Sequence, residues 1–213
     1  MAAVSSSDGR VPPPRIPPLA PREWPREVID AAMALRAPEG HTFAAASGAD
    51  RPKGLAAIGA FAHHPALAQA FFPFNGHVLH GTTLPVRLRA IVVLRVAVKR
   101  QAAYIWAQHF FNGRDAGLTD EEISRIAFGP DAPFFAPLDA AVIRSVDELI
   151  DDGVIGDATW ATLAADLDEQ QLFDLIFTVG CYETVSFLMR SIGLEVDPTI
   201  PDLLAAQQPN GPK

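Results

Sequence analysis

Apolar residues recur at helical spacing along nearly the whole chain, between two ends that lack this pattern. The spacing predicts helices over residues 27–36, 54–64, 65–80, 87–100, 102–116, 121–128, 138–151, 157–165 and 169–192. No segment sustains the alternation of a half-buried strand, and the apolar run 91–94 lies inside a longer helical window. The pattern therefore predicts an all-α protein, built as an orthogonal or up-and-down helical bundle.

Helix boundaries are marked by recognisable residues. Thr119 and Glu122 form the Ser/Thr-x-x-Glu pattern of a capping box at the start of a short helix. Gly193 stands where the last helix should end. Pro73 lies within the third predicted helix, where proline removes a backbone donor, so we expect that helix to kink or end early. Residues 37–53 read as a loop.

Three regions are predicted along the chain. Residues 1–25 are a proline-rich arm, either a mobile tail or an extended segment that lies on a neighbouring subunit. Residues 26–198 form a single helical domain, and residues 199–213 form a C-terminal tail. The many apolar and aromatic residues in short helices, together with the arm, predict a homo-oligomer.

Composition narrows the class of protein. The chain has 213 residues, 49% of them hydrophobic, which suffices for one core, and its net charge of −8 disfavours nucleic acid as a partner. No apolar run is expected to be long enough to span a bilayer, and the longest candidate, residues 90–98, contains Arg95. No hydrophobic signal segment opens the chain, so we expect a cytoplasmic protein without a membrane partner. Its one cysteine, Cys181, excludes an intramolecular disulfide.

Two residues stand out as candidates for catalysis. His109 shares a helix face with Ile105 and Trp106, and histidine suits acid–base chemistry at neutral pH, although such a residue is often structural. Arg95 has apolar neighbours one helical turn away, which is costly for a charge without a partner. Arg95 is either half of a structural ion pair, with Glu183 or Asp174 as partner, or a clamp for a substrate carboxylate.

The two candidates are expected to line one pocket, because they lie at similar heights on consecutive helices joined by a short turn. Five further residues are expected to bind the substrate, a small carboxylate or oxygenated ring: Tyr104, Trp106, Gln108, Tyr182 and Glu183. Cys181 reads as an inert core thiol rather than a nucleophile. No metal site and no cofactor is expected.

The strings LPVRLRAIVVLRVAVK and YIWAQHFFNGRDAGLTDEEI, from Leu84 to Ile123, resemble the core of carboxymuconolactone decarboxylase-like proteins, which include the alkyl hydroperoxidase D group. The segment SIGLEVDP near the end is similar to the C-terminal part of longer members. The resemblance covers roughly residues 21–198. It implies an all-α fold in a homo-oligomer, with either decarboxylation of a carboxylated lactone or thiol-based reduction of peroxides.

The sequence departs from this family at three places. Peroxidase members carry Cys-x-x-Cys just before the histidine, whereas residues 101–108 contain no thiol. Relatives also place one glutamate four residues before the histidine and another early in the preceding helix, where this chain has Ile105 and Ala90. The resemblance therefore implies a cofactor-free lyase or isomerase rather than a peroxidase, with a non-catalytic oligomeric binding protein as the other alternative.

Overall fold

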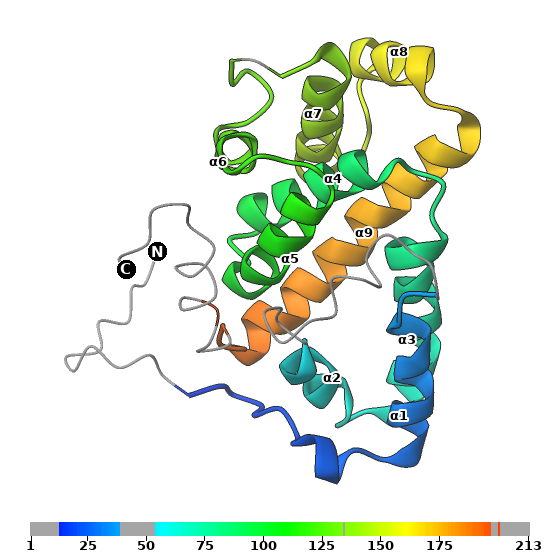
Figure 1. Cartoon of the computed structure of the whole chain (residues 1–213), viewed down its shortest axis with the longest axis vertical. Helices are drawn as coiled ribbons and strands as arrows, with labels where there is room; N and C mark the ends of the chain where they lie inside the picture. Colours follow the sequence, from blue (N-terminus) through cyan, green and yellow to red (C-terminus); the bar gives the residue numbers. More distant parts are fainter. Residues whose placement is uncertain (1–12, 39–53, 134, 197–199, 201–213) are drawn as a thin grey trace, which may run out of the picture.

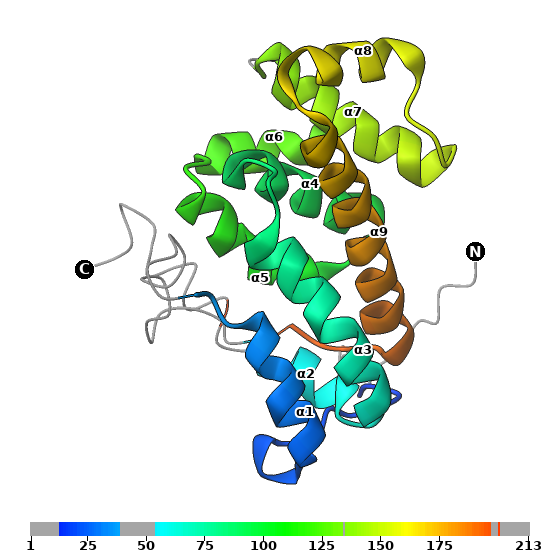
Figure 2. The same cartoon turned by 90° about the vertical axis from the view of Figure 1, so that its right-hand side faces the viewer.

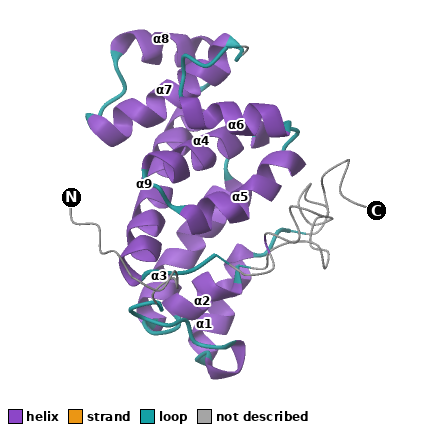
Figure 3. Ribbon diagram, turned by 90° about the vertical axis from the view of Figure 1, so that its left-hand side faces the viewer, coloured by secondary structure: helices purple, strands orange, loops and turns teal. Residues whose placement is uncertain are grey.

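The computed structural model describes residues 13–38, 54–133, 135–196 and 200, and all regular structure within these residues is helical, as Figures 1 and 3 show. The prediction of an all-α chain is confirmed. The elements are η1 (Pro21–Glu23), α1 (Arg26–Ala31), η2 (Ala32–Leu35), α2 (Leu55–Phe61), α3 (Pro65–Gly76), η4 (His77–Gly81), α4 (Val86–Lys99), α5 (Ala103–Asp115), α6 (Asp120–Phe128), α7 (Pro137–Asp151), α8 (Asp157–Asp166) and α9 (Glu169–Ile192).

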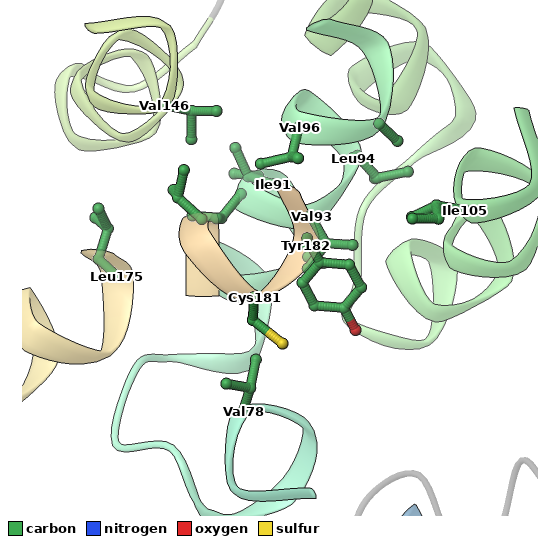
Figure 4. Packing of buried hydrophobic residues seen from close by; sticks show 14 of the residues in the cluster. Val78, Ile91, Val93, Leu94, Val96, Ile105, Val146, Leu175, Cys181 and Tyr182 are labelled. Carbon is green, nitrogen blue, oxygen red and sulfur yellow. The ribbon is translucent and has the colours of Figure 1, made fainter. Parts of the chain in front are cut away.

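Helix α4 is the centre of the bundle, and it packs against α5, α6, α7 and α9. Residues 88–97 of this helix are all buried, which explains why its sequence is apolar on every face. Helices α6, α7 and α8 gather at one end of α4, and α1, α2 and α3 gather at the other, as the two views in Figures 1 and 2 show. In Figure 4, side chains from α4, α5, α7, α9 and η4 meet in one core.

The turn between α4 and α5 takes only three residues. Gln101 adopts a left-handed backbone conformation with φ of 51°, and the amide of Ala102 donates to the carbonyl of Ala97 at 2.8 Å. This conformation turns the chain sharply, so that α5 packs back against α4. The short connection was predicted, and it brings residues of both helices to one cavity wall.

The predicted helix boundaries are largely confirmed, with one correction. Thr119 and Glu122 form a reciprocal capping box at the start of α6, and Gly193 ends α9 with φ of 70°. Pro73, however, does not end α3, which continues to Gly76 and then widens into the π-helix η4. The chain thus stays helical past Pro73, with a change from α-helical to π-helical geometry directly after Gly76.

The proline-rich arm lies on its own chain over the part that the structure describes. The amide of Arg15 donates to the carbonyl of Ile192 at 2.7 Å, and the amide of Leu19 donates to the carbonyl of Gly59 at 3.1 Å. A Cβ atom on Gly59 would lie 2.4 Å from the carbonyl oxygen of Leu19, so glycine permits this close approach. The described part of the arm thus contacts α2 and the end of α9 of the same chain.

Some predicted segments fall outside the described residues. These are residues 1–12 of the arm, most of the predicted loop 37–53, and the C-terminal tail apart from Ile200. Ile200 is buried against Ala107 and Phe111 of α5.

Helix α9 corrects the expectation that no segment is long and apolar enough to cross a bilayer. It has 24 residues and contains a window of mean hydropathy 1.5. However, 44% of that window is buried inside the bundle, and the central helix of a helical domain has the same composition. The length and hydropathy of α9 are therefore weak evidence for a membrane.

Candidate functional site

A cavity of about 850 Å³ lies between the N-terminal group of helices and the α5–α9 side of the bundle. Its walls come from α1, η2, α2 and α3 on one side and from α4, α5 and α9 on the other. This volume lies in the upper part of the range typical of small-molecule sites, about 300–1,000 Å³. Of the seven predicted site residues, the cavity brings together four: His109, Tyr104, Gln108 and Tyr182.

His109 faces the cavity from α5, and its ring is fixed from two sides. The ring meets the phenol ring of Tyr182 edge to face, with the two centroids 4.9 Å apart. On the other side, Nδ2 of Asn112 lies 3.2 Å from Nδ1 of His109. With the amide oriented in this way, Asn112 donates and Nδ1 accepts, so the neutral imidazole carries its proton on Nε2.

The surroundings of His109 keep its imidazole neutral. Desolvation is the main cause, and the positive charge of Arg89 adds to it, so that the pKa falls from 6.5 to about 3. The residue is partly buried and lines the cavity. At neutral pH His109 is therefore a hydrogen-bonding group rather than a cation.

Arg89 supplies a buried positive charge in the cavity wall. It is a buried residue of α4, and its Nη1 donates to the carbonyl oxygen of Leu79 in η4. Burial lowers the pKa of the guanidinium, whereas its proximity to Tyr182 raises it. An arginine remains charged at neutral pH after such shifts. Arg89 therefore sets the electrostatic potential felt by His109 and Tyr182.

Tyr182 completes the polar end of the cavity from α9. In Figure 4 its ring leaves the helix towards α5, while Cys181 points towards Val78 of η4. Burial is the main reason why the pKa of the Tyr182 hydroxyl is raised, with a smaller opposing effect of Arg89. The phenol therefore keeps its proton at neutral pH and can donate a hydrogen bond to a ligand.

Arg95 does not share this cavity, which corrects its predicted placement beside His109. Its Nε and Nη2 each lie 2.7 Å from the Asp147 carboxylate of α7, and its Nη1 donates to the carbonyl oxygen of Ile126 at the end of α6. Arg95 is buried on the side of α4 that faces α6 and α7. The alternative of a structural ion pair is thus the one observed, although the partner is Asp147 rather than Glu183 or Asp174.

Two of the predicted substrate-binding residues also lie elsewhere. Glu183 accepts a hydrogen bond from Nε of Arg100 at 2.6 Å, and the guanidinium of Arg100 lies over the ring of Phe187. Trp106 is partly buried and packs against the main hydrophobic core. Neither Glu183 nor Trp106 lines the cavity.

Cys181 lies beside the cavity wall but not in it. Its Sγ accepts a hydrogen bond from Nδ2 of Asn75 at 3.3 Å, and burial raises the pKa of the thiol to about 11. A thiol with such a pKa carries almost no thiolate at neutral pH. Within the described ranges, no three histidine, cysteine or acidic side chains lie close enough together to hold a metal ion.

The role of Arg89 was missed by the sequence analysis, although a signal for it was present. Arg89 has Val86 one helical turn before it and Val92 and Val93 one turn after it, an environment as apolar as that of Arg95. Arg89 and Arg95 are six residues apart, so they point to different sides of α4 at 3.6 residues per turn. Only the packing of the neighbouring helices decides which of the two meets His109.

The polar end of the cavity therefore combines three kinds of group from three helices. Arg89 provides a fixed cation, Tyr182 a hydroxyl donor, and His109 a neutral imidazole whose protonation responds to nearby charge. Such an arrangement can bind an anion and stabilise negative charge that develops on a ligand oxygen.

Comparisons with known proteins agree with this fold. Residues 65–148 match the model of the carboxymuconolactone decarboxylase family. A protein of unknown function from Agrobacterium tumefaciens, described as a candidate antioxidant defence protein AhpD, has 17% sequence identity and a TM-score of 0.59 over 64% of this chain and 94% of its own. The alkylhydroperoxidase AhpD core of an uncharacterized peroxidase-related protein from Ralstonia eutropha JMP134 has 14% identity and a TM-score of 0.69 over 89% of this chain and 95% of its own.

No functionally curated protein matches the sequence significantly. At these low identities the two solved structures establish the fold alone, while the family model covers the segment that contains Arg89 and His109. Residues 65–148 thus match the carboxymuconolactone decarboxylase family, and the chain has an alkyl hydroperoxidase D-like fold without the Cys-x-x-Cys pair.

Proposed function

We propose that this protein is a cofactor-free lyase or isomerase that acts on a carboxylated or lactone ring substrate in the cavity. The observation that carries the proposal is the convergence of Arg89, His109 and Tyr182 at one end of a cavity whose lining is mostly apolar. A cation and two hydrogen-bonding groups in a desolvated site favour a reaction in which negative charge develops on a substrate oxygen.

Decarboxylation next to a carbonyl group fits these groups. The bond between the carboxylate carbon and the ring carbon breaks, its electron pair moves into the adjacent carbonyl as an enolate, and carbon dioxide leaves. The charge of Arg89 and the hydroxyl of Tyr182 stabilise the enolate oxygen. The ring carbon then takes up a proton, which leaves the product neutral at that carbon.

His109 is the proposed source of that proton. A bound carboxylate offsets the charge of Arg89 and raises the pKa of His109 from about 3, so the imidazole takes up a proton from solvent only when substrate is present. The imidazolium donates this proton to the carbon and returns to its neutral form. Coupling protonation to substrate binding reconciles the low pKa of the free site with a role as general acid.

The test is release of carbon dioxide from a panel of carboxylated lactones and β-keto acids, with product analysed in D2O for deuterium at the carbon that lost the carboxylate. His109→Gln and Arg89→Met should each lower kcat/KM about 100-fold or more. Trp106→Phe, on the same helix as His109 but outside the cavity lining, is the matched control and should leave turnover unchanged. Turnover that survives His109→Gln and Arg89→Met would contradict the assignment.

A binding protein without turnover is the second candidate, and Ile105 is the observation that favours it. Ile105 is buried and lines the cavity at the position where relatives place a glutamate. It makes the pocket drier and leaves His109 without a carboxylate at that place. Tight binding of a ligand that is recovered unchanged after long incubation would select this candidate.

We further propose that the protein works in the cytoplasm as a homo-oligomer, with a small molecule rather than nucleic acid or a membrane as its partner. The net charge of −8 supports the exclusion of nucleic acid. Peroxide reduction is disfavoured because it needs a reactive thiolate and a second thiol, whereas Cys181 is buried with a raised pKa.

A further inference from the structure

The cavity is larger than a small lactone acid requires, and most of its large apolar side chains lie on one wall. With a volume of about 850 Å³, it would leave most of its space unfilled if such a molecule lay against Arg89, His109 and Tyr182. Water in the remaining space would lie against apolar walls, which is unfavourable. The size of the cavity therefore points to a ligand with a substantial apolar part.

Most of the large apolar side chains of the cavity come from a different part of the fold than Arg89, His109 and Tyr182, although Arg36, Asn75 and His80 line that part as well. Arg89, His109 and Tyr182 belong to α4, α5 and α9 in the middle of the bundle. The opposite wall comes from the helices that precede α4, and its large apolar side chains include Trp24, Ile29, Met33, Leu55, Ile58 and Phe71. In Figure 2 these N-terminal helices, coloured blue to cyan, lie together at one end of the molecule. We name this set of six the tail wall.

Several side chains of the tail wall are exposed, although they are large and apolar. Leu55 is 44% exposed and Met33 is 51% exposed, yet both line the cavity. Covering such side chains with an apolar ligand is favourable in proportion to the area removed from water. The tail wall is thus an incompletely covered apolar surface that continues from the polar end of the cavity.

The segments that carry the tail wall are held in place by contacts with one another and with the rest of the fold. Phe61 of α2 stacks on Phe71 of α3 with centroids 5.2 Å apart, and the hydroxyl of Tyr104 accepts from the amide of Ala57 at 3.3 Å. Nε1 of Trp24 donates to the carbonyl oxygen of Leu19 at 2.8 Å. These contacts exist without a ligand, so little ordering of the wall opposes binding.

We propose that the ligand of this cavity is an amphipathic monocarboxylic acid, whose carboxylate or adjacent oxygen lies at Arg89, His109 and Tyr182 and whose alkyl or fused-ring tail lies on the tail wall. The inference rests on the proposed function, because it uses the same polar end, and it names the substrate class. Each methylene that enters the apolar part should strengthen binding by up to about fourfold, until the wall is covered.

The experiment measures the affinity of straight-chain carboxylates from butanoate to dodecanoate, by calorimetry below the concentration at which each forms micelles. The affinity should rise steadily with chain length in the unmodified protein. Leu55→Glu and Met33→Glu should abolish this rise. Leu67→Glu is the matched control, because Leu67 is 45% exposed like Leu55 but does not line the cavity, and it should keep the full rise.

Changes at the polar end distinguish this inference from the proposed function. Arg89→Met should weaken binding at every chain length and leave the increase per methylene intact. The methyl ester of dodecanoic acid should bind the parent protein more weakly than the acid. Affinity that does not change with chain length but depends on Arg89 would overturn the inference and leave the proposed function standing. Affinities that rise with chain length but are the same in Arg89→Met as in the parent would overturn the proposed position of the carboxylate. They would overturn the proposed function as well. Failure of all these acids to bind would overturn the inference outright.

Discussion

The ring of His109 meets the ring of Tyr182 edge to face, with centroids 4.9 Å apart and planes inclined by 88°. The two residues are far apart in sequence, on α5 and α9, and both helices pack on α4, which carries Arg89. This contact orients the imidazole towards the cavity and excludes water from one of its edges. It also explains why the protonation of His109 is controlled by its surroundings rather than by solvent.

The first prediction concerns the titration of His109. In the unligated protein, NMR of its ring protons should show a pKa near 3. Arg89→Met should raise that value, because it removes the positive charge, but should leave it below 6.5, because burial is the larger cause. The unfolded chain takes up a proton near pH 6.5 and the folded chain does not, so between about pH 6.5 and 3 this residue lowers stability as pH falls, by at most about 1.4 kcal/mol per pH unit. A His109 pKa near 6.5 that is the same in Arg89→Met would contradict the buried surroundings described for this residue.

The second prediction separates the structural arginine from the functional one. Asp147→Asn should cost about 3–5 kcal/mol in the free energy of unfolding, because it removes the charge that pairs with buried Arg95. Asp151→Asn is the matched control: it lies one turn further along α7 and pairs with Lys99, but its side chain is 56% exposed against 19% for Asp147. The control should lose less than about 1 kcal/mol.

Urea unfolding at pH 7 measures both variants. Ligand affinity of the folded Asp147→Asn protein should equal that of the parent, because neither Arg95 nor Asp147 lines the cavity. Equal stability losses in the two variants would mean that the buried pair has no special role.

The third prediction concerns Cys181. The protein should not reduce alkyl hydroperoxides with a thiol reductant, because the pKa of the only thiol is about 11 and the site has no second thiol to resolve a sulfenic acid. Cys181→Ser should behave like the parent in ligand binding and in any turnover of carboxylated substrates. Peroxide turnover that disappears in Cys181→Ser would restore the peroxidase alternative.

The fourth prediction concerns the oligomer. Phe173, Phe177 and Phe187 are exposed on one face of α9, with Gly180 between them, where a Cβ atom would meet nothing within 4 Å. A stripe of this kind fits the same stripe of a second copy across a twofold axis. Light scattering at micromolar concentration should therefore show a homo-oligomer, and Phe177→Lys should dissociate it.

Phe128→Lys is the control for that experiment. Phe128 is also strongly exposed, but it lies at the end of α6, away from the α9 stripe, and its replacement should not change the molecular mass in solution. A monomeric parent protein, or a Phe177→Lys protein that stays assembled, would contradict this surface as the interface.

Local pattern was sufficient to predict most of the fold. The apolar period, the Thr119–Glu122 capping box and Gly193 placed most helix ends within a residue or two, because these signals act within one helical turn. His109 was identified as a site candidate on the same local grounds. The α3 helix ends at Gly76, before the predicted residue 80, and its continuation as the π-helix η4 was not predicted, because such a turn has no clear sequence signature.

The sequence by itself determined the helices, their order and the resemblance to the carboxymuconolactone decarboxylase family, and it singled out His109 and the lack of a thiol pair. The tertiary structure alone decided which arginine of α4 meets that histidine. Arg89 and Arg95 have equally apolar neighbours in sequence, but α7 brings Asp147 to Arg95, whereas α5 and α9 bring His109 and Tyr182 to Arg89. The physical reason is that the free energy of a buried charge depends on partners that approach through space, and helix periodicity carries no information about which helix packs on which face.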